Sequence, residues 1–344
     1  MSTLKNLKEI IELDSKLNGE IPVTREELLV LVKSWGEIDV NVDDYDQYVK
    51  NVGMCYDLSR LDVSQITDMS YLFQDSPFDG DISNWDTSNV TSMESMFFRA
   101  TNFNQPLNFD TSKVINMSYM FYNTKSFNQP INFNTSKVTS MKGMFNNASS
   151  FNQELNFDTS KVTSMYGMFN KARTFNQPLN FNTSSVTNMK GMFDNAITFN
   201  QELNFDTSNV TDMNHMFCAA RVFNQNVSKW DISNVTNMGL MFHGSNKFNQ
   251  NISSWDLSNI IYCDEMFNNA ESFINRYNSG EPLPNYTNEI KEWINNNRDR
   301  MNDIDIKDKY SDQIDDFFSN ITDIYSTNRI GLHNNIHSLP ISIL

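Results

Sequence analysis

Apolar positions follow two different periodicities within one short stretch of the chain. From residue 141 to residue 148 they fall at i, i+3, i+4 and i+7, which predicts one buried face of a short helix. Leu155 and Phe157 then lie two positions apart with a polar residue between them, which predicts a short strand. Asp158 and the Thr-Ser pair after it supply turn-forming side chains. We therefore expect one strand, one turn and one short helix from this stretch.

This stretch is one copy of a tandem repeat. A Met-Phe pair returns every 24 residues through the middle of the chain and every 25 residues towards its C-terminal end. The phenylalanines of these pairs are Phe97, Phe121, Phe145, Phe169, Phe193, Phe217, Phe242 and Phe267, with Leu72-Phe73 as a degenerate first copy. One unit has too little apolar surface to fold alone, because its side chains can be buried only against neighbouring units. The repeat therefore predicts about nine stacked units with their strands in a parallel sheet.

Stacking in register would place equivalent residues in columns along the array. One column consists of valines, namely Val90, Val114, Val138, Val162, Val186, Val210 and Val235. We expect this column to form a core ladder whose members match in volume. Another column consists of Asn-Gln pairs such as Asn128-Gln129 and Asn152-Gln153. Amide side chains in register can hydrogen-bond along such a column, and an amide-lined ligand groove is the functional alternative.

Two further columns vary from unit to unit, and we expect partner specificity there. The position two residues before the phenylalanine is glycine in the central units but Tyr119 or His215 elsewhere, so we expect it to have room and to face solvent. The position before the strand leucine is proline, glutamate or asparagine. The predicted partner-binding residues are Tyr119, Glu154, Tyr166, Glu202 and His215.

Three segments of the chain carry a resemblance to a known family. They read SNVTSMESMF, FNQNVSKWDISNVTNMGLMF and FNQNISSWDLSN, and they resemble the repeat of BspA-like leucine-rich-repeat surface proteins. That family occurs in bacteria, large DNA viruses and protists. The segment Arg25-Glu26-Glu27-Leu28-Leu29, followed by Trp35, is similar to the family's N-terminal cap. The resemblance covers residues 21–275. It implies an α/β solenoid related to leucine-rich repeats, a binding or surface role and no catalytic residues.

The ends of a stacked array need covering, which suggests three parts: residues 1–60 as a helical N-terminal cap, 61–275 as the repeat array and 276–344 as a helical acidic C-terminal cap. Thr24 to Glu27 form a capping box that predicts a helix running to about Trp35. Apolar periodicity predicts an earlier helix at residues 4–11 and two more at 286–302 and 311–325. Alternatively, either end is a recruiting module, since Ile21-Pro22 and the leucines that follow resemble the start of an F-box.

Composition narrows the classes of partner. The 344 residues carry a formal net charge of −16, which argues against nucleic acid and against anionic membrane surfaces. Three cysteines without paired spacing predict reduced thiols rather than a disulfide framework or a zinc site. No signal peptide or long apolar segment is evident, so we expect a cytoplasmic protein without membrane insertion, in a host cytoplasm or a virion if the source is viral.

The usual motifs of catalysis and metal binding are incomplete. Residues 39–43 copy the first half of a calcium loop, but Asp44 and Lys50 stand where glycine and a bidentate glutamate are needed. His333 and His337 are spaced i, i+4 without a third ligand. Aspartates at the repeat turns could suggest calcium sites, but asparagine replaces them in two units, which favours a turn role. We expect no enzyme, no cofactor and no metal.

The predicted function is therefore a protein-protein interaction scaffold that binds a partner along a preformed surface. The alternative is a structural or surface-displayed component, such as a virion protein or adhesin, with possible self-association. The sequence does not identify the partner.

Overall fold

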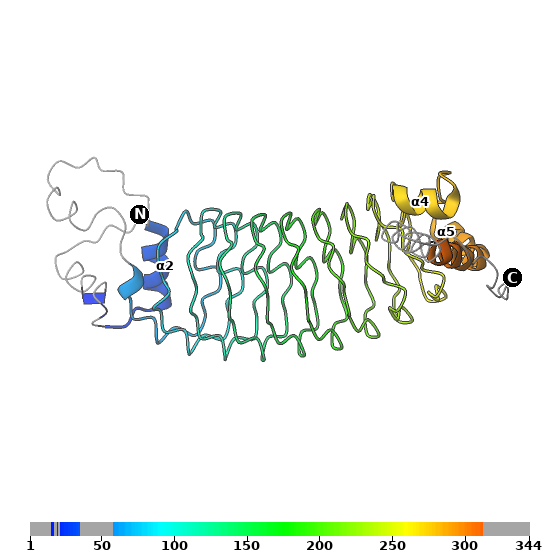
Figure 1. The fold of residues 1–344 in the computed structure, drawn as a ribbon. Coiled ribbons are helices and arrows are strands. Elements are labelled where there is room, and N and C mark those ends of the chain that lie inside the picture. The colour runs from blue at the N-terminus through cyan, green and yellow to red at the C-terminus, as the bar shows by residue number, and fades with distance from the viewer. Residues whose placement is uncertain (1–14, 17–18, 20, 35–57, 312–344) are drawn as a thin grey trace, which may run out of the picture.

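The computed structural model describes residues 15–16, 19, 21–34 and 58–311 of the chain. Successive units lie side by side as flattened coils in one elongated row, with helices at both ends (Figure 1). Helix α2 (Arg25–Ser34) and the 3-10 helix η1 (Leu58–Arg60) precede the row. Helices α4 (Glu271–Asn278) and α5 (Thr287–Asn296) follow it, and residues 298–311 continue in helical conformation. The repeats therefore pack mainly against their sequence neighbours.

Each pair of neighbouring coils is joined by one parallel β-bridge at the same position of the unit. The bridge between Ser140 and Ser164 is typical, and equivalent bridges run from Asp68–Ser92 to Asn237–Tyr262. The Thr163 N–H donates to the Thr139 carbonyl (3.0 Å), and the Met141 N–H donates to the Ser164 carbonyl (3.3 Å). The β-bridge thus lies just before the Met-Phe segment, which is residues 141–148 and their equivalents in the other coils. The sequence predicted the paired strand at residues 155–157 instead.

The helix predicted over residues 141–148 is not formed. The Gly143 and Phe145 N–H groups donate to carbonyls of the next coil at 2.7 and 2.9 Å. The residues between them close local turns, as when the Met144 N–H donates to the Met141 carbonyl (3.3 Å). Gly143 and Asn147 have φ values of 55° and 56°, in the left-handed region that an α-helix cannot contain. Every second N–H group of the segment donates to the next coil. These groups therefore cannot form the i→i−4 hydrogen bonds of an α-helix.

The core is a set of apolar columns that run through the whole row. The repeat valines, methionines and Met-Phe phenylalanines are fully buried. Phenylalanines of neighbouring coils stack almost in parallel, with ring centroids 5.6 Å apart for Phe121–Phe145 and 5.7 Å for Phe145–Phe169. Within a coil, Phe145 also stacks on Phe151 at 4.2 Å. The predicted valine ladder is confirmed, because the valines are fully buried in the same core as these aromatic columns.

The Asn-Gln columns form the predicted ladder of amides. The Asn128 N–H donates to the Asn104 Oδ1 at 2.9 Å, and the Gln129 Nε2 donates to the Asn104 carbonyl oxygen at 3.0 Å. The same two bonds recur between Asn152-Gln153 and Asn128. Each asparagine therefore satisfies a backbone donor and a side-chain donor of the following coil, so the amide column stabilises the stack.

The N-terminal cap supplies hydrogen-bond donors. The capping box is confirmed, because the Thr24 N–H donates to Glu27 Oε2 (2.9 Å) and the Glu27 N–H donates to Thr24 Oγ1 (3.3 Å). Helix α2 so anchored projects Arg25 onto the first coil, where its guanidinium donates to the carbonyls of Asp68 (3.0 Å) and Ser70 (2.8 Å). In later coils the equivalent carbonyls accept N–H groups of the preceding coil. Arg25 thus takes the place of a missing coil.

The C-terminal cap also occupies positions that a further coil would fill. Gln250 donates to the Asn224 carbonyl (2.9 Å), and one repeat later Arg276 of α4 donates to the Asn249 carbonyl (3.2 Å). Lys291 of α5 donates to the Ile260 carbonyl (3.0 Å). These contacts satisfy acceptors that stacking would otherwise leave open.

Donors of the last coil are covered by a second set of contacts. The Cys263 N–H donates to Thr287 Oγ1 (2.9 Å), and the Glu265 N–H donates to the Asn285 carbonyl (2.7 Å). Helix α4, which we did not predict, begins at Glu271, within the range expected for the repeats. The predicted helix at 286–302 appears as α5 and the helical stretch after it, whereas those at 4–11 and 311–325 lie essentially outside the described residues.

Truncation of one central ring tests the aromatic column. We expect Phe169→Ala to lower the free energy of unfolding by about 3–5 kcal/mol, because Phe169 is fully buried between Phe145 and Phe193. The exposed Tyr166 is the matched control, and Tyr166→Ala should change stability much less. Urea unfolding monitored by circular dichroism measures both, and equal effects would contradict a core role for the column.

Removal of Arg25 tests the N-terminal cap. We expect Arg25→Ala to cost about 1–3 kcal/mol locally, because two backbone acceptors lose their charged donor. Amide hydrogen exchange should then speed up in the first coils but not in the central ones. Lys33→Ala, an exposed change on the same helix, serves as control. Unchanged exchange at residues 68–75 in the Arg25 variant would show that the cap is dispensable.

Candidate binding surface

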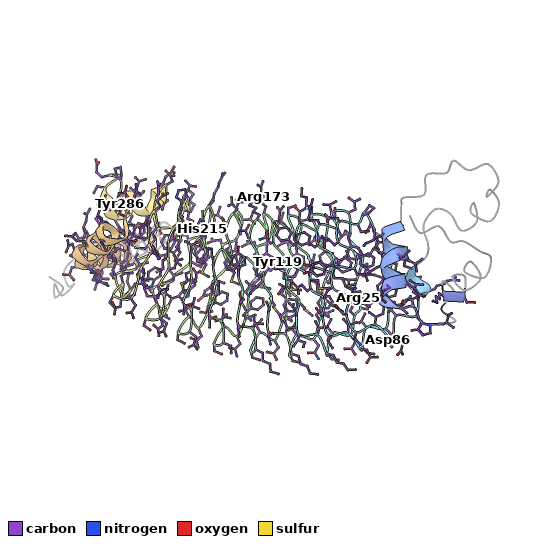
Figure 2. The ribbon with its side chains drawn as sticks, turned by 180° about the vertical axis from the view of Figure 1, so that it is seen from behind. Arg25, Asp86, Tyr119, Arg173, His215 and Tyr286 are labelled. Carbon is purple, nitrogen blue, oxygen red and sulfur yellow. The ribbon has the colours of Figure 1, made fainter. Side chains whose placement is uncertain are left out.

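Every coil presents two faces and two edges to solvent. The bridge face carries residues 139–147 and their equivalents, and the amide face carries residues 152–156 and theirs. Turns at 149–150 and at 160–161 connect the two faces in each coil. Figure 2 shows these turns as opposite edges of the row, with Arg173 labelled at one and Asp86 at the other. We call the edge that carries Arg173 the basic edge and the edge that carries Asp86 the aspartate edge.

The five predicted binding residues do not form one cluster. Tyr119, Tyr166 and His215 lie on the bridge face, each two coils from the next. Glu154 and Glu202 lie on the amide face, where both are exposed. Tyr166 is also exposed, whereas Tyr119 and His215 are half-buried. The structure thus divides the predicted site between two surfaces of the row.

The column of Tyr119 is constrained by its backbone. Its members adopt left-handed φ values, 58° for Tyr119 and His215 and 55° for Gly143. A Cβ atom placed on Gly143 would lie 2.5 Å from Cδ1 of Tyr119, so the tyrosine ring covers this glycine. Gly143, Gly167 and Gly191 are all buried. The expectation that this position faces solvent is therefore wrong for the three glycines, and the expected room is missing at Gly143, whereas a Cβ on Gly167 or Gly191 would meet no atom closer than 3.4 Å. The left-handed backbone favours glycine at all three.

An aromatic and acidic group near the start of the bridge face was not predicted. The Tyr71 hydroxyl donates to Glu94 Oε1 (3.2 Å), and Asn116 Nδ2 donates to Glu94 Oε2 (2.9 Å). Phe98 stacks on Tyr122 in the next coil at 4.6 Å, and Tyr122 meets Tyr119 edge to face. Burial raises the pKa of Tyr119. The repeat alignment alone could have shown that aromatic residues collect in these coils.

His215 and Cys218 occupy a polar part of the same face. Nδ1 of His215 lies 2.5 Å from Asn214 Oδ1, and burial lowers the pKa of this histidine. Burial and the nearby carboxylate of Asp194 raise the pKa of Cys218 to about 12, so its thiol stays protonated at neutral pH and is a poor nucleophile. Among the residues that the structure describes, no group of three His, Cys, Asp or Glu side chains could hold a metal ion.

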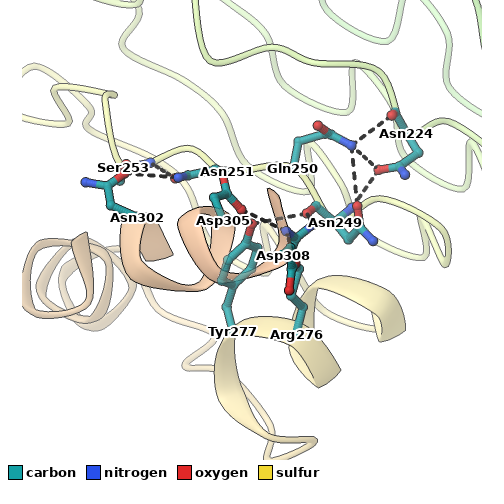
Figure 3. Close-up of polar contacts among 10 residues, drawn as sticks. All are labelled: Asn224, Asn249, Gln250, Asn251, Ser253, Arg276, Tyr277, Asn302, Asp305 and Asp308. Atoms are coloured by element: carbon teal, nitrogen blue, oxygen red, sulfur yellow. Dashed lines mark hydrogen bonds and ion pairs between the residues drawn. The ribbon is translucent and has the colours of Figure 1, made fainter. Parts of the chain in front are cut away.

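A polar pocket of about 270 Å³ lies where residues 298–311 meet the last coils (Figure 3). Asn302 Oδ1 accepts hydrogen bonds from Asn251 Nδ2 (3.0 Å) and Ser253 Oγ (2.7 Å). Asp305 accepts from the Tyr277 hydroxyl (3.0 Å) and pairs with Arg276 (2.8 Å). Most of the polar groups drawn in Figure 3 are bonded to one another, so this pocket serves mainly to hold the cap to the row.

The aspartate edge consists of Asx turns. Asp86 and Asp158 each accept the N–H of the serine two residues later at 3.0 Å, and Asn134 and Asn182 do so at 3.1 Å. The predicted turn role is confirmed. Hydrogen bonds from the hydroxyl and N–H of Ser160 lower the pKa of Asp158 below its ordinary value of 3.8.

The comparisons with known proteins place the chain in a family. A family model described as "Mycoplasma protein of unknown function, DUF285" matches residues 44–155, 131–205 and 203–306, which together span well over half of the chain. The chain belongs to the DUF285 family. No curated protein and no solved structure matches it. As a member of DUF285 the chain is a repeat protein, and the matches extend past the last coil into α4 and α5.

Across the described part of this DUF285 chain, no helix combines the length and apolar character that crossing a membrane requires. The half calcium loop at residues 39–43 and the histidine pair at 333 and 337 lie outside the described residues.

The lowered pKa values of the turn aspartates predict sensitivity to acid. A carboxyl whose pKa is lower in the folded state stabilises the fold above its unfolded pKa, and this contribution is lost as the pH falls through the folded pKa. We expect replacement of the turn aspartates by asparagine to reduce the loss of stability below about pH 4, because the amide keeps the acceptor and does not titrate. The aspartates are Asp86, Asp110, Asp158, Asp206, Asp231 and Asp256.

Urea midpoints at pH 7 and pH 3 measure this effect. Asp299→Asn with Asp303→Asn, at exposed positions outside the turns, is the control. If the control reduces the acid effect as much as the turn variant does, general charge repulsion and not the turn hydrogen bonds accounts for it.

Proposed function

We propose that this DUF285 protein is a non-enzymatic scaffold that binds a partner protein along the side of its row of coils. The observation that carries the proposal is the rigid register of the row, in which backbone and amide hydrogen bonds hold exposed variable side chains at a constant spacing. A preformed surface loses little conformational entropy on binding, so many weak contacts can add up.

The side chains of the variable columns are not needed for folding, and this further supports the proposal. Glu154 and Glu202 are exposed, and proline, asparagine and glutamate alternate at their position without disturbing the stack. Tyr166 is exposed beside the buried Gly167. Positions that the fold leaves free are those at which a repeat protein can encode a partner.

We infer that the stacked units represent an α/β solenoid of the leucine-rich-repeat type and that the protein is a BspA-like member of its family. The recurring parallel bridges and continuous apolar columns support a solenoid, although each unit contains turns where a helix was expected. The surface role of BspA-like proteins supports the alternative, a structural or displayed component.

A capture experiment with the full chain tests the scaffold. The variant Glu154→Ser, Tyr166→Ser, Glu202→Ser changes exposed predicted residues only, and it spares the half-buried Tyr119 and His215. We expect a partner that the parent retains from a lysate to be retained at least about tenfold less by this variant, because several surface contacts are lost together.

The control is Lys137→Ser with Lys161→Ser on the aspartate edge, which should leave retention unchanged. If the parent captures only further copies of itself, the structural alternative replaces the scaffold. If all variants capture the same partner equally, the predicted residues do not form its binding surface.

A further inference from the structure

The basic edge differs in charge from the rest of the protein. Five of its seven turns contain basic side chains, and none contains aspartate or glutamate. The turns are residues 99–102, 123–126, 147–150, 171–174, 195–198, 219–222 and 244–247. The basic residues are Arg99, Lys125, Lys171, Arg173, Arg221 and Lys247, all of them exposed. In a chain of net charge −16, an edge of seven coils without a single carboxylate is a segregated positive surface.

Most of these cations have no counter-charge within the fold. Arg99 pairs with Asp75 at 3.0 Å at the start of the edge. The other five have no ion pair with any residue that the structure describes. Asp75 at one end and Glu271 at the other delimit the positive stretch. Exposed cations that no internal partner satisfies are available to an external one.

The spacing of the cations indicates the shape of that partner. Lys125, Arg173 and Arg221 occupy the same position of their units and lie two coils apart, with Ser149 and Ile197 in the coils between them. Two coils correspond to about 10 Å at the spacing of parallel strands. A polypeptide in the extended polyproline II conformation has three residues per turn and advances about 3.1 Å per residue, so every third side chain lies on the same side and would meet one of these cations.

Apolar side chains accompany the cations in the C-terminal half of the edge. Ile197 lies in the coil between those of Arg173 and Arg221, and it is partly exposed. Val222, next to Arg221, is 39% exposed. Double-stranded nucleic acid carries one charge per about 1.7 Å, which is much denser than the spacing of these cations. The edge therefore fits a sparse anion with apolar groups between its charges.

We propose that the basic edge binds an extended acidic segment of a partner protein, with a carboxylate at every third residue and apolar side chains between them. The proposal rests on the scaffold function above and assigns it a second surface, separate from Glu154, Tyr166 and Glu202. Lys125, Arg173 and Arg221 each pair with one carboxylate, and Ile197 contacts an apolar side chain between two of them.

The test uses the full chain and fluorescent peptides at low ionic strength. One peptide has glutamate at every third position with proline and valine between, which favours polyproline II, and the other has the same composition with its glutamates adjacent. We expect the spaced peptide to bind at least about fivefold more tightly, because only its charges match the cation spacing. Equal binding of the two peptides would overturn the proposed register.

Charge reversal locates the surface. The variant Lys125→Glu, Arg173→Glu, Arg221→Glu should weaken binding of the spaced peptide at least about tenfold. The matched control is Lys113→Glu, Lys137→Glu, Lys161→Glu, which makes the same change in net charge at exposed positions of the aspartate edge and should weaken binding less than about twofold. Equal losses in both variants would mean diffuse attraction and would overturn the proposal.

Three further outcomes separate this inference from its alternatives. Tighter binding of a single-stranded oligonucleotide of equal charge than of the spaced peptide would overturn the peptide assignment. If a partner captured by the parent is lost on changing Glu154, Tyr166 and Glu202 but kept on reversing the basic edge, the scaffold stands and the edge proposal falls. If a captured partner is lost on reversing the basic edge but kept on changing Glu154, Tyr166 and Glu202, the edge stands and the predicted face falls.

Discussion

Hydrogen bonding between coils is the constraint on which the rest of this protein depends. Every second N–H group of the Met-Phe segment leaves its own coil, as the Gly143 and Phe145 donors show. Donors and acceptors can meet in this way only if the coils keep one register, and one register places equivalent side chains above one another. The phenylalanine stacks and the valine ladder follow from that geometry, so core packing and backbone pairing reinforce the same arrangement.

The same constraint creates the problem that the two caps solve. A stack whose hydrogen bonds run along its axis leaves open acceptors and donors at its last members, and buried or partly buried polar groups without partners are costly. Arg25 at one end and Arg276 at the other supply donors where a neighbouring coil is missing. Because each cap imitates a coil only partly, it ends the row and does not extend it.

Function is left to side chains that the stack does not use. The amide columns make hydrogen bonds between coils and the turn aspartates accept the N–H groups of their own turns, so both have a role in the fold. What remains are the variable positions of the two faces, represented by Glu154 and Tyr166, and the basic edge around Arg173 (Figure 2). These positions differ from unit to unit while the backbone stays the same, which allows one rigid frame to carry a specific pattern of charge and apolar contact.

Sequence alone predicted the number and length of the units, the apolar columns, the Asx turns and the capping box, because each depends on local chemistry or on a period that stacking repeats. It did not determine the conformation of the Met-Phe segment. The i, i+3, i+4, i+7 spacing of Met141 to Ala148 suits both a helix and the observed turns, and only bonds to the next coil select the turns. Tertiary structure also decided that Tyr119 covers Gly143 and that the predicted binding residues lie on two faces. The first fact depends on a contact between residues 24 positions apart and the second on the turns that divide each coil, and periodicity within one unit reveals neither.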